Sequence, residues 1–135
     1  MQIVIDSNII MAMLIRPGKP IDLFFDNRLN ICAPLLLFDE LENNKDEIKG
    51  KSNLKDEEFD WLCVILKHNL RIFPEEDFLK YRDKAEIICP DKKDVIFFAL
   101  ALYLQCPMWT NEKMLKEQDD VIVYATHDLM KLFNI

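Results

Sequence analysis

The first eight residues place the strongest constraint on the fold of this chain. Three consecutive β-branched residues, Ile3-Val4-Ile5, are followed abruptly by Asp6 and then by two small polar residues. A short apolar run of this type is typical of a strand that is buried on both faces, as in a parallel sheet covered by helices. Ligand sites in such sheets lie at the carboxyl ends of the strands, so Asp6 is either a helix cap or part of a site.

Short apolar runs and helical patterns alternate along the rest of the chain. Strands are expected at residues 3–5, 29–33, 70–73, 107–110 and 121–125. Helices are expected at residues 9–15, 21–25, 34–41, 55–68, 75–88 and 91–105 and from 126 onward, with Pro34 in a first turn and Thr126 as an N-cap. This alternation predicts an α/β fold with a doubly wound parallel sheet, in a single domain that spans residues 1–135.

Composition limits the classes of protein to which the chain can belong. Half of its 135 residues are hydrophobic, so one core can form without disulfides or a structural metal. The four cysteines are widely spaced, with no C-x-x-C pair, and are expected to be buried free thiols. The N-terminus lacks a basic signal-peptide region, and no apolar run reaches the ~18 residues of a spanning helix. We therefore expect a cytoplasmic protein without a membrane partner.

The formal net charge of −7 argues against general electrostatic attraction to nucleic acid. A nucleic-acid enzyme with this charge needs local cations near its site. Two sets of lysines could supply them: Lys45, Lys49, Lys51 and Lys55 in one part of the chain, and Lys92, Lys93, Lys113 and Lys116 in another. The alternative is that these lysines lie on solvated helix faces, which the sequence favours for most of them.

Four acids follow strands or begin helices at positions that can face one edge of the predicted sheet: Asp6, Glu40, Asp94 and Glu112. Clustered buried carboxylates repel one another unless a cation lies among them. Oxygen ligands favour Mg²⁺ or Mn²⁺, and such an ion can activate water for phosphodiester hydrolysis. Taken singly, each acid could equally be a cap, a first-turn residue or a solvated side chain. Asp91 is expected to cap the helix that follows Asp94.

Four segments, taken in order, resemble the PIN domain family, which includes VapC-like toxin ribonucleases and stand-alone prokaryotic PIN proteins. They are IVIDSN at residues 3–8, PLLLFDEL at 34–41, DKKD at 91–94 followed by ALA at 99–101, and WTNEK at 109–113. The resemblance covers nearly the whole chain. It implies a Rossmann-like three-layer α/β/α sandwich with a parallel sheet of about five strands. It also implies a Mg²⁺ or Mn²⁺ site and endoribonuclease activity on RNA, often as the toxin of a toxin–antitoxin pair.

The resemblance further assigns roles to individual residues. Asp6, Glu40 and Asp94 match the three principal acids of the family motif, and Glu112 falls where the family more usually has Asp, so all four are expected to be catalytic metal ligands. The further acid that the family often places just beyond this point is missing, which favours a single bound ion. Supporting roles are expected for Ser7, Asn8, Asp91, Thr110 and Asn111, and a phosphate contact for Lys113.

Other functions and partners stay open on the sequence alone. A catalytically weak or inactive module that binds nucleic acid or protein is the main alternative, favoured by Glu112 and by the negative charge. A phosphoacceptor receiver domain is discounted, because it needs an Asp at the end of the third strand, where this chain has Phe73-Pro74. The helices around Phe24 and Phe25 are expected either to form a homodimer or to accept an antitoxin helix, although core packing explains the same pattern.

Overall fold

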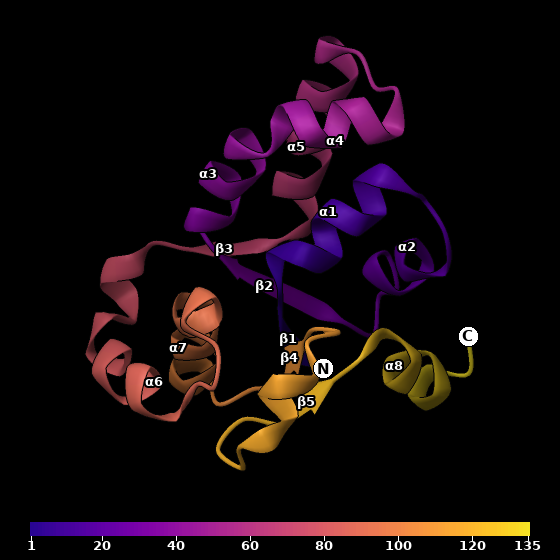
Figure 1. Ribbon diagram of the computed structural model, residues 1–135. Coiled ribbons are helices and arrows are strands. Elements are labelled where there is room, and N and C mark those ends of the chain that lie inside the picture. The colour runs from indigo at the N-terminus through magenta and orange to yellow at the C-terminus, as the bar shows by residue number, and fades with distance from the viewer.

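Five parallel strands form the centre of the computed structural model, which describes residues 1–135 (Figure 1). The strands are β1 (Gln2–Ile5), β2 (Asn30–Pro34), β3 (Arg71–Phe73), β4 (Met108–Trp109) and β5 (Val123–Tyr124). Their order across the sheet is β3-β2-β1-β4-β5, and every neighbouring pair is parallel. The central strand β1 therefore lies where the direction of winding reverses, between β2 and β4, which is where ligands bind in doubly wound sheets.

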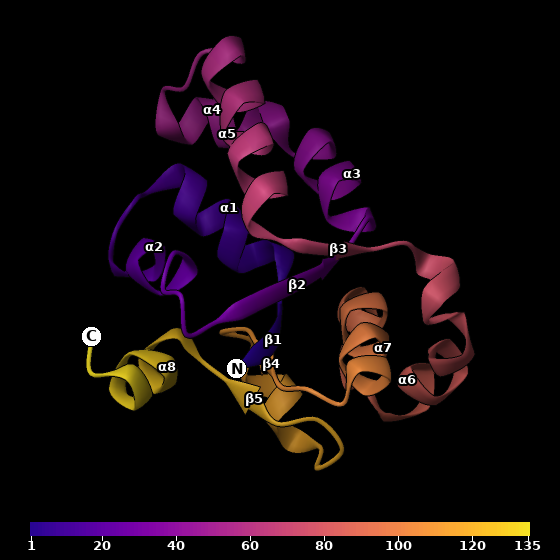
Figure 2. The same cartoon turned by 180° about the vertical axis from the view of Figure 1, so that it is seen from behind.

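Helices cover both faces of this sheet. They are α1 (Ser7–Ile15), α2 (Lys19–Phe24), α3 (Leu36–Asn43), α4 (Lys45–Ser52), α5 (Asp56–Asn69), α6 (Arg82–Ile88), α7 (Val95–Leu104) and α8 (Thr126–Phe133). Four short 3-10 helices join them: η1 (Glu75–Asp77), η2 (Leu79–Tyr81), η3 (Lys92–Asp94) and η4 (Lys113–Glu117). Figures 1 and 2 show α6 and α7 on one face and α1, α2 and α8 on the other, while α3, α4 and α5 extend beyond the sheet. No helix combines the length and apolar character needed to cross a bilayer.

The core is built around β1 and α7. Ile3, Val4 and Ile5 are fully buried, as expected for a strand covered on both faces. Helix α7 packs on β1 and β2, and its buried residues lie on nearly all sides, which explains why its sequence is apolar throughout. Cys32 and Cys89 are buried free thiols, whereas the other two cysteines are half-buried.

The structure corrects several element boundaries. Pro34 is the last residue of β2 and pairs with Phe73, so it does not open a helix, and α3 begins two residues later. Residues 75–88 form η1, η2 and α6 instead of one helix, because Phe78 turns into the core at the break. Helix α4 was not predicted at all, since Ile48 is its only buried residue and no apolar period marks it.

Candidate functional site

Asp6 follows β1 directly and is 1% exposed. One carboxylate oxygen caps α1 by accepting a hydrogen bond from the Asn8 N–H at 3.2 Å, and the other accepts one from the Thr110 hydroxyl at 2.8 Å. Burial raises the pKa of this carboxyl, and the two hydrogen bonds oppose that rise. Asp6 can therefore be both a helix cap and part of a site, because each of its oxygens has lone pairs left for a further ligand.

Asp94 is the most perturbed acid of the chain. It is 5% exposed at the start of α7, but its side chain makes no capping hydrogen bond, and no other donor in the protein reaches it. Burial, followed by repulsion from Asp6, Asp91, Glu112 and Glu40, raises its pKa to about 7. The fold thus brings a buried carboxylate close to four others, an arrangement that favours a bound cation.

Glu40 lies on α3, half-buried, and faces the same group. Burial raises its pKa, and the Asp6 charge adds to the rise. The nearby Ser7 hydroxyl partly offsets the rise in the pKa of both Glu40 and Asp6. A single hydroxyl proton serves one acceptor at a time, so Ser7 cannot neutralise both carboxylates.

A cleft of about 460 Å³ opens beside these acids. Its lining consists of Ser7, Asn8, Met11, Glu40, Asn44, Glu47, Lys93 and Asp94. Met11, Asn44 and Glu47 were not predicted as part of the site. Asn44 borders α4 and Glu47 belongs to it, and this helix has no apolar pattern. Apart from its carboxylate, nothing in the sequence marks Glu47 as a site residue. Lys93 was recognised only as one of several lysines near the acids.

The segment after β4 connects the acids to α8. Thr110 is 1% exposed, and its hydroxyl both donates to Asp6 and accepts from the Glu112 N–H at 3.1 Å. Glu112 is half-buried and contributes to the raised pKa of Asp94. The Asn111 side chain accepts from the N–H of Thr126 at 2.9 Å and so binds the start of α8, not the cleft.

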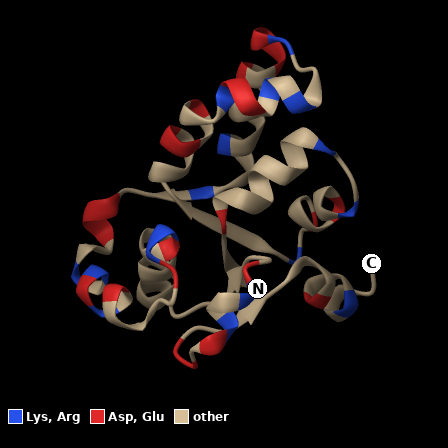
Figure 3. Cartoon of the chain, in the orientation of Figure 1, with Lys and Arg blue, Asp and Glu red and all other residues tan.

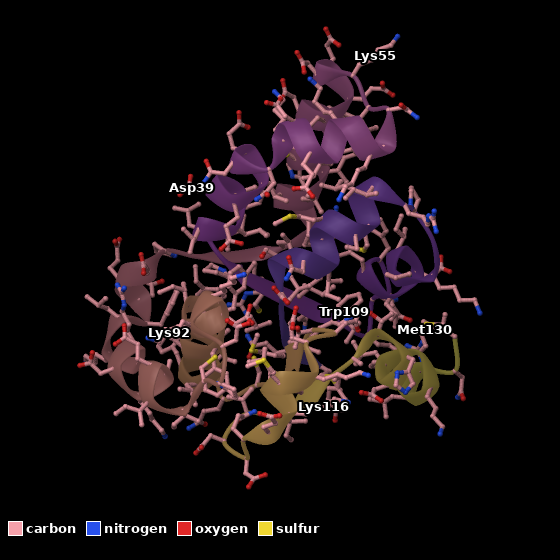
Figure 4. The ribbon with its side chains drawn as sticks, viewed as in Figure 1. Asp39, Lys55, Lys92, Trp109, Lys116 and Met130 are labelled. Atoms are coloured by element: carbon pink, nitrogen blue, oxygen red, sulfur yellow. The ribbon has the colours of Figure 1, made fainter.

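The sequence predicted Thr126 as the N-cap of α8, and this prediction is wrong. The N-cap residue is Ala125, whose N–H donates to the Asp128 carboxylate at 2.8 Å. The Thr126 hydroxyl instead accepts from the indole N–H of Trp109 at 3.0 Å. Trp109 is fully buried near the middle of the molecule (Figure 4), so this bond satisfies a donor that would otherwise be stranded in the core.

The remaining expected residues lie around the cleft. Asp91 caps η3 by accepting from the Lys93 N–H at 3.0 Å, which agrees with the cap interpretation, and its charge also reaches Asp94. Lys113 is exposed at the start of η4 and does not line the cleft. His127 is exposed and close only to Asp128.

The donor set can be compared with the needs of a divalent ion. No three Asp, Glu, His or Cys side chains converge closely enough to form a ready-made metal cage. The acids beside the cleft nevertheless offer only oxygen, the donor type that Mg²⁺ and Mn²⁺ prefer. Magnesium commonly takes one or two carboxylates and completes its shell with water and substrate phosphate. These residues therefore fit an ion that is held partly by protein and partly by water or substrate.

Comparisons with known proteins agree with this architecture. The family model described as PIN domain matches residues 4–119. The fold is similar to a solved structure described as VapBC2 from Rickettsia felis bound to a DNA fragment from their promoter, with a TM-score of 0.64 and 17% sequence identity. That match covers 93% of this chain and 98% of the other. A search of curated proteins finds no significant match. The expected fold class and the family resemblance are confirmed.

Proposed function

This chain belongs to the PIN domain family, and on that premise we propose that it is a divalent-metal-dependent endoribonuclease that hydrolyses RNA phosphodiester bonds. The main support for the proposal is the environment of Asp94. Its carboxylate is buried, accepts no hydrogen bond and is surrounded by four other acids. Repulsion among these groups is relieved by a bound cation, and a cation held by oxygen ligands at a sheet edge is suited to phosphoryl chemistry.

Each acid has a distinct part in this proposal. Asp94 and Asp6 would hold Mg²⁺ or Mn²⁺ directly, with Glu112 acting through water because it is longer and only half-buried. The bound ion would polarise a phosphoryl oxygen and lower the pKa of water. Glu40, with its raised pKa and its place in the cleft lining, would accept the proton of the attacking water. Ser7 and Thr110 would orient Glu40 and Asp6 by hydrogen bonding.

A cleavage assay tests this proposal. Single-stranded RNA of mixed sequence would be incubated with the protein and Mn²⁺ or Mg²⁺, with and without a chelator. Asp6→Asn and Asp94→Asn should both abolish metal-dependent cleavage. Asp39→Asn is the matched control, because Asp39 is an exposed acid next to Glu40 that does not line the cleft. Residual cleavage that is equal in all three variants would mean that the activity does not come from this site.

An inactive binding module is the second candidate function, favoured by the absence of a ready-made metal cage and by Glu112 in the usual Asp position. Calorimetric titration with Mn²⁺ separates the two functions. A metal-dependent enzyme should bind Mn²⁺ in a manner that depends on Asp6 and Asp94. A vestigial pocket should show no such binding.

We also propose a protein inhibitor, or antitoxin, as the partner of the apolar hollow between α1, α2 and α5. Its lining includes Ile10, Phe24, Phe25 and Leu66, and Phe25 is 54% exposed. The solved structure with a similar fold is a two-protein assembly by its description, which favours a partner for this chain too. Phe25→Ser should prevent capture of a co-expressed small protein encoded by the adjacent gene. The expected homodimer stays a prediction, and light scattering of the isolated protein measures it.

A further inference from the structure

The lysines of η3 differ from those of α4 in whether a carboxylate forms an ion pair with them. Three lysines of α4 form ion pairs with acids of α4 or α5: Lys45 with Asp60 at 3.6 Å, Lys49 with Asp56, and Lys51 with Glu47 at 2.8 Å. Figure 3 shows the resulting mixture of charges on α4 and α5. Lys92 and Lys93 form no ion pair, although the chain carries 24 acids against 17 basic residues. These two ammonium groups therefore stay without a carboxylate partner.

The turn that carries these two lysines is fixed by the backbone. The Asp91 carboxylate accepts from the Lys93 N–H at 3.0 Å, and the Asp91 carbonyl accepts from the Asp94 N–H at 3.1 Å. Both bonds hold η3 as a single 3-10 turn at the start of α7. The ammonium groups are therefore carried on an ordered turn directly beside Asp94, and not on a free loop.

Neighbouring residues of a 3-10 turn point about 120° apart, so the two side chains serve different spaces. Lys93 lines the acidic cleft together with Glu40 and Asp94. Lys92 lines a second hollow, of about 470 Å³, on the other side of the turn, together with Ile96 and the ion pair of Arg82 with Glu86. Figure 4 shows Lys92 beside α7, far from Lys55 at the outer end of α4 and α5. The turn thus places one ammonium group at the cleft and one at a neighbouring hollow.

We propose that Lys92 and Lys93 bind the phosphate backbone of single-stranded RNA, so that the strand crosses η3 on its way into the cleft; this rests on the ribonuclease function proposed above. A phosphate at Lys93 is next to the acids that would hold the ion, and the following part of the strand passes Lys92 into the second hollow. The chain as a whole repels RNA, so attraction must come from cations that no carboxylate has neutralised. Lys49 and Lys51 are paired with carboxylates, so they offer RNA no such free cation.

A binding experiment tests the proposal without requiring catalysis. The Lys92→Gln/Lys93→Gln variant is compared with Lys49→Gln/Lys51→Gln, which changes the net charge by the same amount. Binding of a fluorescent single-stranded RNA is measured by anisotropy in chelator at several salt concentrations. Two lost phosphate contacts should lower the slope of log K against log salt by about 1.4 and the affinity at 0.1 M salt by roughly 25-fold. The control should lose less than about twofold. Equal losses in both variants, or no loss in either, would overturn the proposal.

Cleavage kinetics separate this inference from the proposed function. With active protein, the Lys92/Lys93 variant should raise KM far more than it lowers kcat, because the contact is made equally to substrate and transition state. Equal KM values in the variant and the control refute the inference while leaving the nuclease function intact. Failure of the wild-type protein to cleave RNA with any divalent metal refutes the function, whereas the salt-dependence result still decides where the strand binds. Both lysines are exposed, so circular dichroism should show unchanged folding.

Discussion

Replacing Asp94 with Asn should make the metal-free protein more stable. Its carboxyl has a pKa near 7 in the folded protein against an ordinary value of 3.8. Between these values the unfolded chain has lost the proton while the folded protein still holds it, so stability falls as pH rises through this window. Each pKa unit corresponds to about 1.4 kcal/mol, so ionised Asp94 costs the fold about 4 kcal/mol above pH 7. That is a large fraction of the roughly 5–15 kcal/mol that holds a domain together.

The assay is urea unfolding of wild type and Asp94→Asn in chelator from pH 4 to pH 8. The free energy of unfolding of the variant should exceed that of wild type by a small amount near pH 4. The difference should grow by about 1.4 kcal/mol per pH unit and level off above pH 7. Asp39→Asn, the same change at an exposed position, should stay within about 0.5 kcal/mol of wild type at every pH. Added Mn²⁺ should stabilise only the proteins that retain Asp94, by about 2.7 kcal/mol at 100 times the dissociation constant. A difference in unfolding free energy between Asp94→Asn and wild type that does not change with pH would refute the proposed destabilisation by ionised Asp94.

Three further predictions concern the same group of residues. Mn²⁺ binding needs ionised Asp94, so calorimetric affinity should fall about tenfold for each pH unit below 7, and a flat profile between pH 5 and pH 7 would contradict this. Thr110→Val removes the donor to Asp6 and the acceptor of the Glu112 N–H, and should cost about 1–3 kcal/mol in urea unfolding, whereas Thr110→Ser should recover most of it. Glu112→Gln should slow RNA cleavage by roughly 10–100-fold, as for groups that act on a metal indirectly. Complete loss of cleavage in that variant would instead indicate a direct ligand.

The sequence predicts the elements whose burial dictates their composition. Ile3-Val4-Ile5 and the apolar run of α7 are surrounded by core on all sides, so their residue types carry the information directly. Helix α4 gives no such signal, because Ile48 is its only buried residue and its tertiary ties include ion pairs with α5. The cleft residues near it were missed for the same reason.

The candidate site, like the fold, was predicted from the sequence only in part. The position of Asp6 after a strand and that of Asp94 at the start of an apolar helix were enough to nominate both acids, because such positions can face the carboxyl edge of the sheet. The sequence predicted repulsion among these acids, but not the burial of Asp94, which is the largest cause of its raised pKa. The role of Thr126 was misassigned because its hydroxyl is occupied by Trp109, a partner 17 residues away. Contacts of this kind depend on the packing of side chains and leave no local pattern.

The position of β1 has a consequence for how the protein is made. It precedes the other four strands in the chain and is the central strand of the sheet, but its partner β4 begins more than 100 residues later. Asp6 gains its Thr110 donor only after this late strand has docked. A chain that ends before β4 therefore lacks both Glu112 and the Thr110 donor to Asp6. The candidate site is complete only after β4 has been synthesised and has paired with β1.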